Sequence, residues 1–232
     1  MIEKRDLKNR ICIATMCGHW EQIADDFGAG VEIDYFCQAE NMDGTRGEKV
    51  IAEVEKIVHK RDARVLHAPF NELFPASIDP KARELAMNRL SAAADIAVQL
   101  GIKKMVVHSG YMPFTYFKEW HVSKSIAFWK EFMEKRPDDF EICIENVLDD
   151  EPYMLAEIAE KAGDPRIGLC YDVGHANIKG KGGFDGRPET TDQREWLEVT
   201  APYLKHVHIH NNDGKRDYHR GFETGTVNME EL

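Results

Sequence analysis

Short apolar runs alternate with longer amphipathic stretches along most of the chain. Seven runs rich in β-branched residues cover residues 10–16, 30–36, 64–67, 104–108, 140–146, 167–172 and 204–210. In the stretches between them, clearest at residues 79–100, 119–135 and 151–161, apolar residues recur at helical spacing. A strand followed by a helix, repeated seven times, predicts parallel βαβ units.

Boundary residues support two of these helices. Asp79 is a good N-cap, Pro80 follows at the first helical position, and Gly101 ends the pattern. Gly163 and Pro165 likewise end the helix predicted over residues 151–161. No low-complexity linker or change of composition divides the chain, so a single domain over residues 1–232 is expected.

Two architectures fit this alternation, an open doubly wound sheet and a closed (β/α)8 TIM barrel. The first run is followed by MCGHW, not by the glycine-rich loop of a dinucleotide-binding sheet. Polar residues at the ends of the later runs also favour the barrel, because barrel enzymes build their active sites from the C-terminal ends of several strands. We therefore predict an α/β protein of the TIM-barrel class.

The last five runs each bring a metal-ligand type of side chain to the same end of the sheet. Alternate strand residues share a face, so Val106 and His108 point one way while Val107 points to the helices. Imidazoles and carboxylates are the donors of a divalent-metal site, and a cation offsets the repulsion between neighbouring acids. The residues predicted at this mouth are His67, His108, Glu145, Asp172 and His208, with His175 three residues after Asp172.

Four of the other histidines are predicted to have structural roles. His206 and His210 are expected to lie deeper in the barrel and in the following loop, while His59 and His121 fall in predicted helices and are expected at the surface. The segment after the seventh run also contains a histidine, in the pair Asp217 and His219. Alone this pair is typical of a solvated loop, but beside His175 it could complete another metal position.

Composition narrows the function. Lys plus Arg number 30 and Asp plus Glu number 41, which gives a net charge of −11 and argues against a general nucleic-acid binder. Hydrophobic residues make up 43% of the 232, a globular composition that can form a core without disulfides. Five scattered cysteines without CxxC pairs, and no membrane span or signal peptide, predict a reduced cytoplasmic protein with no membrane partner.

An ordered set of motifs resembles a known family. HAPF, VVHSGY, ICIENV, GLCYDVGHA and HVHIHNNDG followed by DYHRGFETG are similar to the motifs of the xylose-isomerase-like TIM barrels, over residues 67–227. That superfamily includes sugar and sugar-phosphate isomerases and epimerases and the type-four apurinic endonucleases, also called AP endonuclease family 2. The resemblance implies one to three divalent ions, with Zn, Mn, Mg and Co as candidates.

The resemblance also implies ligand sets. One metal site of the endonuclease branch matches His67, His108 and Glu145. The site shared with the epimerase branch matches Glu145, Asp172 and His208, with a Glu on the eighth strand as fourth ligand. The third endonuclease position matches His175, Asp217 and His219.

The chain departs from the family pattern in three places. Asn211 stands where an Asp often follows the seventh-strand His, and the usual glycine-rich turn reads Glu223, Thr224 and Gly225. The eighth strand and its Glu are absent, and the chain ends in TVNMEEL, where Asn228 begins a capping-box pattern. We therefore expect a domain truncated at its C-terminus, or a last unit supplied by a partner chain, with a homodimer left open.

The resemblance favours a metal-dependent isomerase or epimerase of a sugar, sugar phosphate or related polyol. Glu145 would transfer the proton, and His175 would position the substrate or bind a further metal. His19 and Trp20 offer an aromatic wall for the sugar. The glycine-rich residues 177–191, with Lys179, read either as a lid that contacts a phosphate or as an ordinary surface loop.

Two other functions stay open at this point. The alternative is a zinc-dependent phosphodiesterase of the AP-endonuclease type that acts on abasic DNA, for which all eight implied ligands ahead of the missing Glu are present. Phe70 and Leu73 could then serve as wedges, although core packing explains them equally well. The charge of −11 counts against DNA as a partner. A sugar- or metal-binding barrel without activity is the third hypothesis.

Overall fold

The computed structural model describes residues 10–179 and 193–230. Its strands are β1 (Cys12–Ala14), β2 (Gly30–Ile33), β3 (Arg64–His67), β4 (Lys104–His108), β5 (Glu141–Glu145), β6 (Ile167–Asp172) and β7 (Leu204–His208). Its α-helices are α2 (Trp20–Phe27), α3 (Gly44–Val58), α4 (Pro80–Gln99), α5 (Lys118–Met133), α6 (Tyr153–Ala162), α7 (Val173–Lys179) and α8 (Gln193–Thr200). Short 3-10 segments are η1 (Tyr35–Cys37), η2 (Ala39–Met42) and η3 (Ala201–Tyr203).

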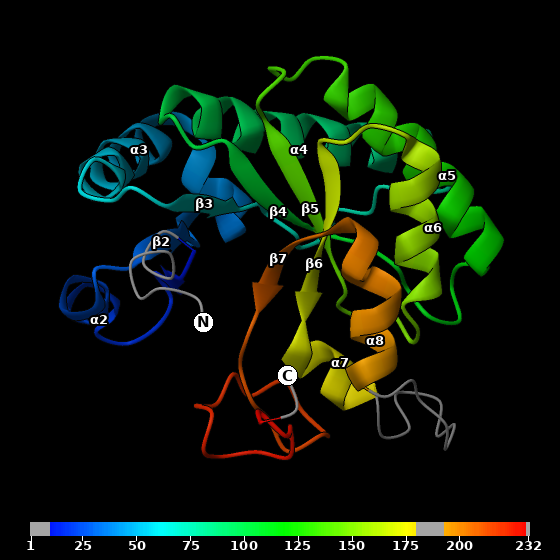
Figure 1. Ribbon diagram of the computed structural model, residues 1–232. Helices are drawn as coiled ribbons and strands as arrows, with labels where there is room; N and C mark the ends of the chain where they lie inside the picture. Colours follow the sequence, from blue (N-terminus) through cyan, green and yellow to red (C-terminus); the bar gives the residue numbers. More distant parts are fainter. Residues whose placement is uncertain (1–9, 180–192, 231–232) are drawn as a thin grey trace.

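The strands form one parallel sheet in the order in which they occur along the chain, from β1 to β7. A doubly wound sheet would instead start in the middle and reverse its order. The sheet curls, and helices α3, α4, α5, α6 and α8 form an arc outside it (Figure 1). The prediction of a TIM-barrel type of α/β fold is therefore confirmed, with seven strands in the described part of the chain.

Local sequence explains where the elements begin and end. β3, β4 and β6 coincide with the predicted runs. The Asp79 carboxylate accepts the backbone N–H of Lys81 at 2.8 Å and caps α4, and Gly101 follows that helix with a left-handed φ of 70°. β2 is shorter than its run because the chain turns at Asp34, whose N–H donates to Thr15 Oγ1 at 2.9 Å.

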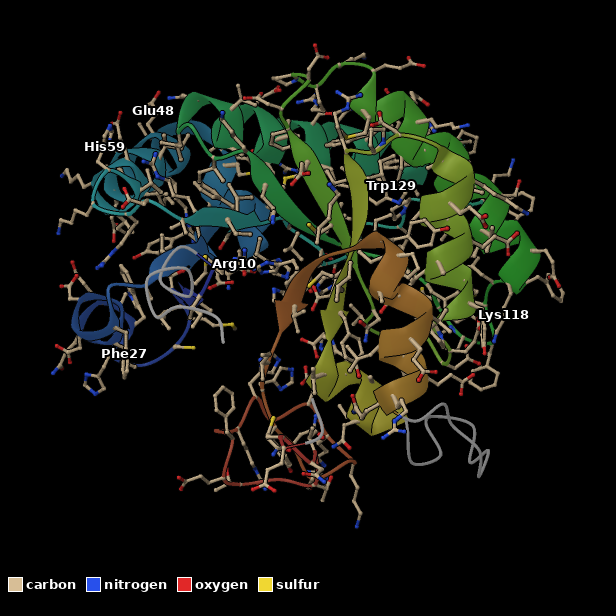
Figure 2. The ribbon with its side chains drawn as sticks, viewed as in Figure 1. Arg10, Phe27, Glu48, His59, Lys118 and Trp129 are labelled. Carbon is tan, nitrogen blue, oxygen red and sulfur yellow. The ribbon has the colours of Figure 1, made fainter. Side chains whose placement is uncertain are left out.

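The two faces of the sheet differ as strand alternation predicts. Inside the curl, small apolar side chains form a separate cluster of Val65, Val106, Cys143 and Cys170. On the outer face Val107, Ile144 and Tyr171 are fully buried in the main core with the helices. That core includes Trp129 of α5, which lies inside the arc in Figure 2, whereas Glu48 and His59 lie on its outer rim. By the same alternation Val207 belongs to the outer face of β7, but it is 36% exposed.

The prediction for His121 is wrong. His59 is exposed as expected, but His121 is completely buried on the inner side of α5. Its ring lies 5.1 Å from that of Tyr111 and 6.3 Å from that of Tyr116. Burial lowers the pKa of His121 to about 4, so the ring is neutral at pH 7.

Disulfides and membrane-spanning helices can be checked directly in the described part of the chain. All five cysteines are free, and Cys143 and Cys170 are buried. In residues 10–179 and 193–230 no helix combines the length and the apolar character that crossing a membrane requires.

Candidate metal centre

Glu145, the last residue of β5, is the centre of the cluster at the C-terminal ends of the strands. Its Oε2 lies 3.2 Å from Nε2 of His67 and 3.3 Å from Nε2 of His108. Its Oε1 lies 2.9 Å from Nδ1 of His208 and 3.4 Å from Nδ1 of His175. Four histidines from separate elements thus converge on one carboxylate that is 1% exposed.

Asp172, the last residue of β6, lies on the other side of His208. Its Oδ2 is 3.6 Å from His208 Nδ1, and its Oδ1 accepts the backbone N–H of His175 at 2.6 Å. Asn146 ties β5 to β6 at this point, because its side chain donates to the Asp172 carbonyl at 2.9 Å and accepts the Asp172 N–H at 2.8 Å. The epimerase-type trio of Glu145, Asp172 and His208 is therefore assembled.

A second buried carboxylate, Glu32 of β2, approaches His208 from inside the barrel. Glu32 Oε1 lies 2.8 Å from His208 Nε2, and Oε2 lies 2.9 Å from His206 Nε2. Hydrogen bonds from these two rings to Glu32 orient His208 so that its Nδ1 faces Glu145. His206 lies deeper in the barrel, as expected.

A second cluster lies beside the first, between α7 and the loop that follows β7. It contains the predicted His175, Asp217 and His219, and also His210, which sequence reasoning left out. Asp217 Oδ2 is 3.1 Å from His175 Nε2 and 3.0 Å from His219 Nε2. His175 thus reaches Glu145 with one ring nitrogen and Asp217 with the other.

The charges in the first cluster are strongly coupled. Burial would raise the pKa of Glu145, but the neighbouring His208 lowers it well below its usual range, so the carboxylate is ionised. Burial likewise opposes ionisation of Asp172, yet His175 and His208 hold its pKa low. Burial lowers the pKa of His108 to about 3, which leaves a neutral imidazole suited to ligation.

The residues fit a divalent cation. Asp172 Oδ2 is buried and forms no hydrogen bond with the described atoms. Both ring nitrogens of His208 face carboxylates, so the metal-free ring carries a proton on each nitrogen, and a cation can take the place of the proton on Nδ1. The candidate groups of ligand atoms within 4.8 Å of one another include His67, Glu145 and His208, and also Glu145, Asp172 and His175.

Phe70 and Leu73, the two candidate wedge residues, lie in different surroundings. Leu73 is 5% exposed and belongs to the main core, so it is not available as a wedge. Phe70 stacks on His108 with ring centroids 4.2 Å apart and meets the edge of His67 at 5.7 Å. It forms an apolar wall beside the two histidines.

The predicted substrate-binding residues lie at the margins of the described chain. His19 is exposed and precedes α2 with a left-handed φ of 60°, and Trp20 packs partly buried against the main core. Asn177 is buried, and its amide donates to Asn212 at 2.7 Å. The side chain of Lys179 and residues 180–191 of the predicted lid lie outside the described residues.

Asn211 explains how the loop after β7 is folded. Its amide oxygen accepts the N–H groups of Asn212 at 2.9 Å and Val227 at 3.0 Å, while its amide nitrogen donates to the Phe222 carbonyl at 3.1 Å. Its backbone also pairs with Arg220. An Asp here could not make the donation to Phe222, so the departure from the family pattern supplies a loop-stabilising amide.

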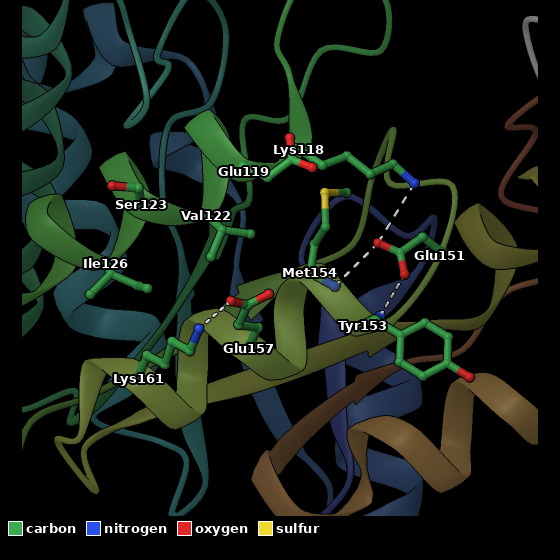
Figure 3. A pocket seen from close by; sticks show the side chains of 10 residues that line it. All are labelled: Lys118, Glu119, Val122, Ser123, Ile126, Glu151, Tyr153, Met154, Glu157 and Lys161. Carbon is green, nitrogen blue, oxygen red and sulfur yellow. Dashed lines mark hydrogen bonds and ion pairs between the residues drawn. The ribbon is translucent and has the colours of Figure 1, made fainter.

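A separate hollow of about 460 Å³ lies on the outer helices, between α5 and α6 (Figure 3). It is lined by ion pairs such as Lys161 with Glu157 at 2.5 Å and Lys118 with Glu151 at 3.7 Å. None of the metal-type residues at the strand ends lines it. The chemistry-bearing side chains of the described chain are thus concentrated at the barrel mouth.

The fold and the cluster together define a TIM-barrel protein with metal-ligand side chains at the ends of its strands. Residues 22–232 match the family model described as xylose isomerase-like TIM barrel, and the chain belongs to this family. The resemblance stated from the motifs is confirmed.

Comparisons with individual proteins agree. The chain is 29% identical over 177 residues to the uncharacterized protein MJ1311 of Methanocaldococcus jannaschii. The aligned region covers 72% of this chain and 58% of that protein. The match therefore spans less than two thirds of the length of that relative. Among solved structures, a D-tagatose 3-epimerase-like protein is similar with a TM-score of 0.72 and 24% identity, covering 96% of this chain and 84% of that one. The TTHB071 protein of Thermus thermophilus, from a crystal soaked with ZnCl2, has a TM-score of 0.71 and 22% identity, covering 94% and 84%. These two likenesses establish the fold.

Proposed function

We propose that the chain is a divalent-metal-dependent isomerase or epimerase of a sugar, sugar phosphate or related polyol. The observation that carries the proposal is the Glu145 carboxylate, buried at the barrel mouth between His67, His108 and His208. The family and the structural likeness to a D-tagatose 3-epimerase-like protein support a sugar substrate. The ZnCl2-soaked neighbour agrees with a metal cofactor without identifying it.

Glu145, Asp172 and His208 would hold the ion, with His67 and His108 on the far side of Glu145. When bound, a divalent cation would polarise a carbonyl of the substrate and offset the negative charge of the carboxylates. The protein supplies the orientation of these ligands, through Glu32 on His208 and Asn146 on Asp172.

Glu145 would also accept the proton from the carbon beside the carbonyl and return it. Two features of the site fit that role. The carboxylate is ionised, as a proton acceptor must be, and at 1% exposure it is shielded from water. An epimerase needs a second proton donor on the opposite face of the carbon, and in the family this is the eighth-strand Glu.

The remaining roles are assigned as part of the same proposal. Phe70 forms an apolar wall next to His108, suited to the carbon-bound face of a sugar. His19 and Trp20 at the start of α2 would contribute a second wall, and Lys179 at the end of α7 would contact a phosphate. His175 joins the two clusters and would hold a further metal rather than touch the substrate directly.

Exchange with solvent deuterium tests this function even while the substrate is unidentified. The full chain, loaded with Mn, Co or Zn, is incubated in D2O with a panel of ketoses, ketose phosphates and inososes, and NMR detects deuterium on carbon and new epimers. Exchange in at least one sugar is the expected result. Absence of exchange across the panel with metal-loaded, folded protein would refute the proposal.

Two Glu→Gln variants on the same strand sharpen the test. Glu145→Gln is expected to abolish exchange, while Glu141→Gln removes a carboxylate at the other end of β5, where it pairs with Lys205 away from the cluster. Equal loss in both would indicate a folding defect, which thermal unfolding checks directly. Nicking of an abasic duplex by zinc-loaded protein, with no exchange in any sugar, would instead support the phosphodiesterase.

A further inference from the structure

Asp34 is a carboxylate at the barrel mouth to which neither metal-type cluster gives a role. It directly follows β2 and is the next position after Glu32 on the same face of that strand. Ile33 and Leu66 are paired across β2 and β3, and both belong to the main core outside the sheet. The residues that follow them, Asp34 and His67, are therefore directed to the inside of the curl. Asp34 thus lies beside the first cluster, on the side of β1 and β2.

One oxygen of the Asp34 carboxylate is held by the end of β1. Oδ2 accepts hydrogen bonds from Thr15 Oγ1 at 3.2 Å and from the Met16 N–H at 3.1 Å. The Asp34 N–H donates in return to Thr15 Oγ1 at 2.9 Å, and the Thr15 N–H donates to the Glu32 carbonyl at 2.9 Å. These hydrogen bonds fix the direction in which the carboxylate points.

The other oxygen, Oδ1, forms no hydrogen bond with the described atoms, and it is not one of the buried unpaired atoms among them. It is therefore accessible, although Asp34 as a whole is only partly exposed. Burial raises the pKa of Asp34, the Glu32 carboxylate raises it further, and His67 lowers it, so the side chain lies within electrostatic range of both. A partly desolvated carboxylate with one open oxygen lacks a donor that the described chain does not supply.

The chemistry of that oxygen selects its partner. An ionised carboxylate only accepts hydrogen bonds, and its bonds with hydroxyl groups are short and about twice as strong as neutral ones. A phosphate or carboxylate of a ligand would instead be repelled by Asp34 and by the neighbouring Glu32. A metal ion is not the partner that the geometry favours, because none of the candidate ligand groups among the described residues contains Asp34.

We propose that Asp34 is a substrate-binding residue that accepts a hydrogen bond from a hydroxyl group of the sugar. The uncharged, hydroxyl-bearing end of the substrate then lies against the ends of β1 and β2. This inference rests on the proposed function, since it takes a sugar or polyol as the ligand of the mouth. It adds a rule of specificity: a phosphorylated sugar must place its phosphate away from β2, which agrees with the proposed phosphate contact of Lys179 at the end of α7.

Sugar binding by the zinc-loaded full chain tests the proposal, because diamagnetic zinc permits NMR detection of the ligand. The probes are D-fructose, D-tagatose, phosphorylated D-fructose and an inosose, and saturation-transfer titrations give their dissociation constants. In Asp34→Asn the amide oxygen can keep the hydrogen bonds from Thr15 and Met16, while the NH2 group replaces the open acceptor. Affinity for the unphosphorylated probes is expected to fall by roughly 10-fold or more, with zinc per chain unchanged.

Two variants serve as controls. Thr15→Val removes one donor to Oδ2 but leaves the Asp34 carboxylate and the Met16 N–H, so it should lower thermal stability and change the affinity at most a few-fold. Asp26→Asn removes a negative charge from the exposed side of α2 and should leave the affinity unchanged. A loss in Thr15→Val as large as that in Asp34→Asn would mean that Asp34 only holds the turn, and would overturn the proposal.

The phosphorylated probe adds a test of sign. If Asp34→Asn bound phosphorylated D-fructose more tightly than wild type, the phosphate would lie against β2 and the proposal would be wrong. Unchanged affinity of Asp34→Asn for every probe, or no binding of any probe by wild type, would also overturn it. The proposed function fails separately: a sugar that binds without exchanging deuterium would refute the isomerase chemistry, while the affinity of Asp34→Asn would still decide the role of Asp34.

Discussion

Asp149 offers a quantitative test of the packing behind the metal cluster. It lies in the loop after β5, is 1% exposed, and accepts hydrogen bonds on Oδ2 from Ser109 Oγ at 2.7 Å and from Val147 N–H at 3.0 Å. Its Oδ1 is buried and unpaired with any described atom. Burial raises the pKa of Asp149 from its ordinary value of 3.8 to about 6.

The sign and size of the effect follow from that shift. Because the folded state holds the proton more tightly than the unfolded state, its stabilisation is complete below pH 3.8 and is lost as pH rises through about 6. Complete ionisation of Asp149 lowers the free energy of unfolding by about 3 kcal/mol. About 1.4 kcal/mol of this loss occurs between pH 5 and pH 8. Asp149→Asn keeps an acceptor oxygen and does not titrate, so it should escape this loss.

Urea unfolding with chelator present, at pH 5 and at pH 8, measures the effect. Relative to wild type, the unfolding free energy of Asp149→Asn should rise by about 1.4 kcal/mol between the two pH values. Ser109→Ala removes the hydroxyl that favours the ionised form and should steepen the loss. Parallel pH profiles for wild type and Asp149→Asn would refute the reasoning.

Three further changes probe the site and the helix beside it. Glu32→Gln should weaken binding of the first ion roughly 10- to 100-fold by calorimetry, because Glu32 orients His208; unchanged affinity would contradict that role. Phe70→Ala should weaken the binding of this ion only a few-fold, since the Phe70 ring holds His108 by stacking. A loss of affinity as large as that of Glu32→Gln would contradict this view. His121 stays neutral in the folded state, with a pKa of about 4, so its contribution to stability is present above pH 6.5 and lost as pH falls. His121→Phe should therefore lose about 2 kcal/mol less than wild type between pH 7.5 and pH 5, and equal losses in urea unfolding would refute the assignment.

The strand-end ligands could be predicted because two local rules suffice for them. Alternation fixes the face of each strand residue, and parallel strands bring their C-terminal ends together. His108, Glu145 and Asp172 each occupy the last position of a strand whose end was predicted within one residue. Their placement at one mouth follows from the pattern of the chain alone.

Glu32 and His210 escaped prediction for different physical reasons. Glu32 meets His206 across the inside of the curled sheet, a contact between residues 174 positions apart that depends on curvature rather than on local pattern. His210 lies beyond β7, where alternation no longer applies and the backbone direction is set by the pairing of Asn211 with Arg220.

His121 could have been predicted. It lies four residues before Ser125 and is in register with Phe128 and Phe132, all buried on the same side of α5. His121 was expected at the surface because histidine is polar, although its position in the helical period places it on the buried face. A buried histidine on an otherwise apolar helix face remains neutral and packs as a ring.

Because His208 lies between two carboxylates, binding of a metal ion at this residue requires the release of a proton. Burial would lower the pKa of His208, but the buried carboxylates of Glu32 and Glu145 raise it well above 6.5, so the metal-free ring carries a proton on each nitrogen. A cation that takes Nδ1 must displace one of those protons. Adding metal to the unbuffered protein should therefore acidify the solution, and the heat of binding should vary with the ionisation enthalpy of the buffer. A proton and a metal ion thus compete for Nδ1 of His208, so the pH sets the metal occupancy of the barrel mouth and the metal concentration sets its protonation.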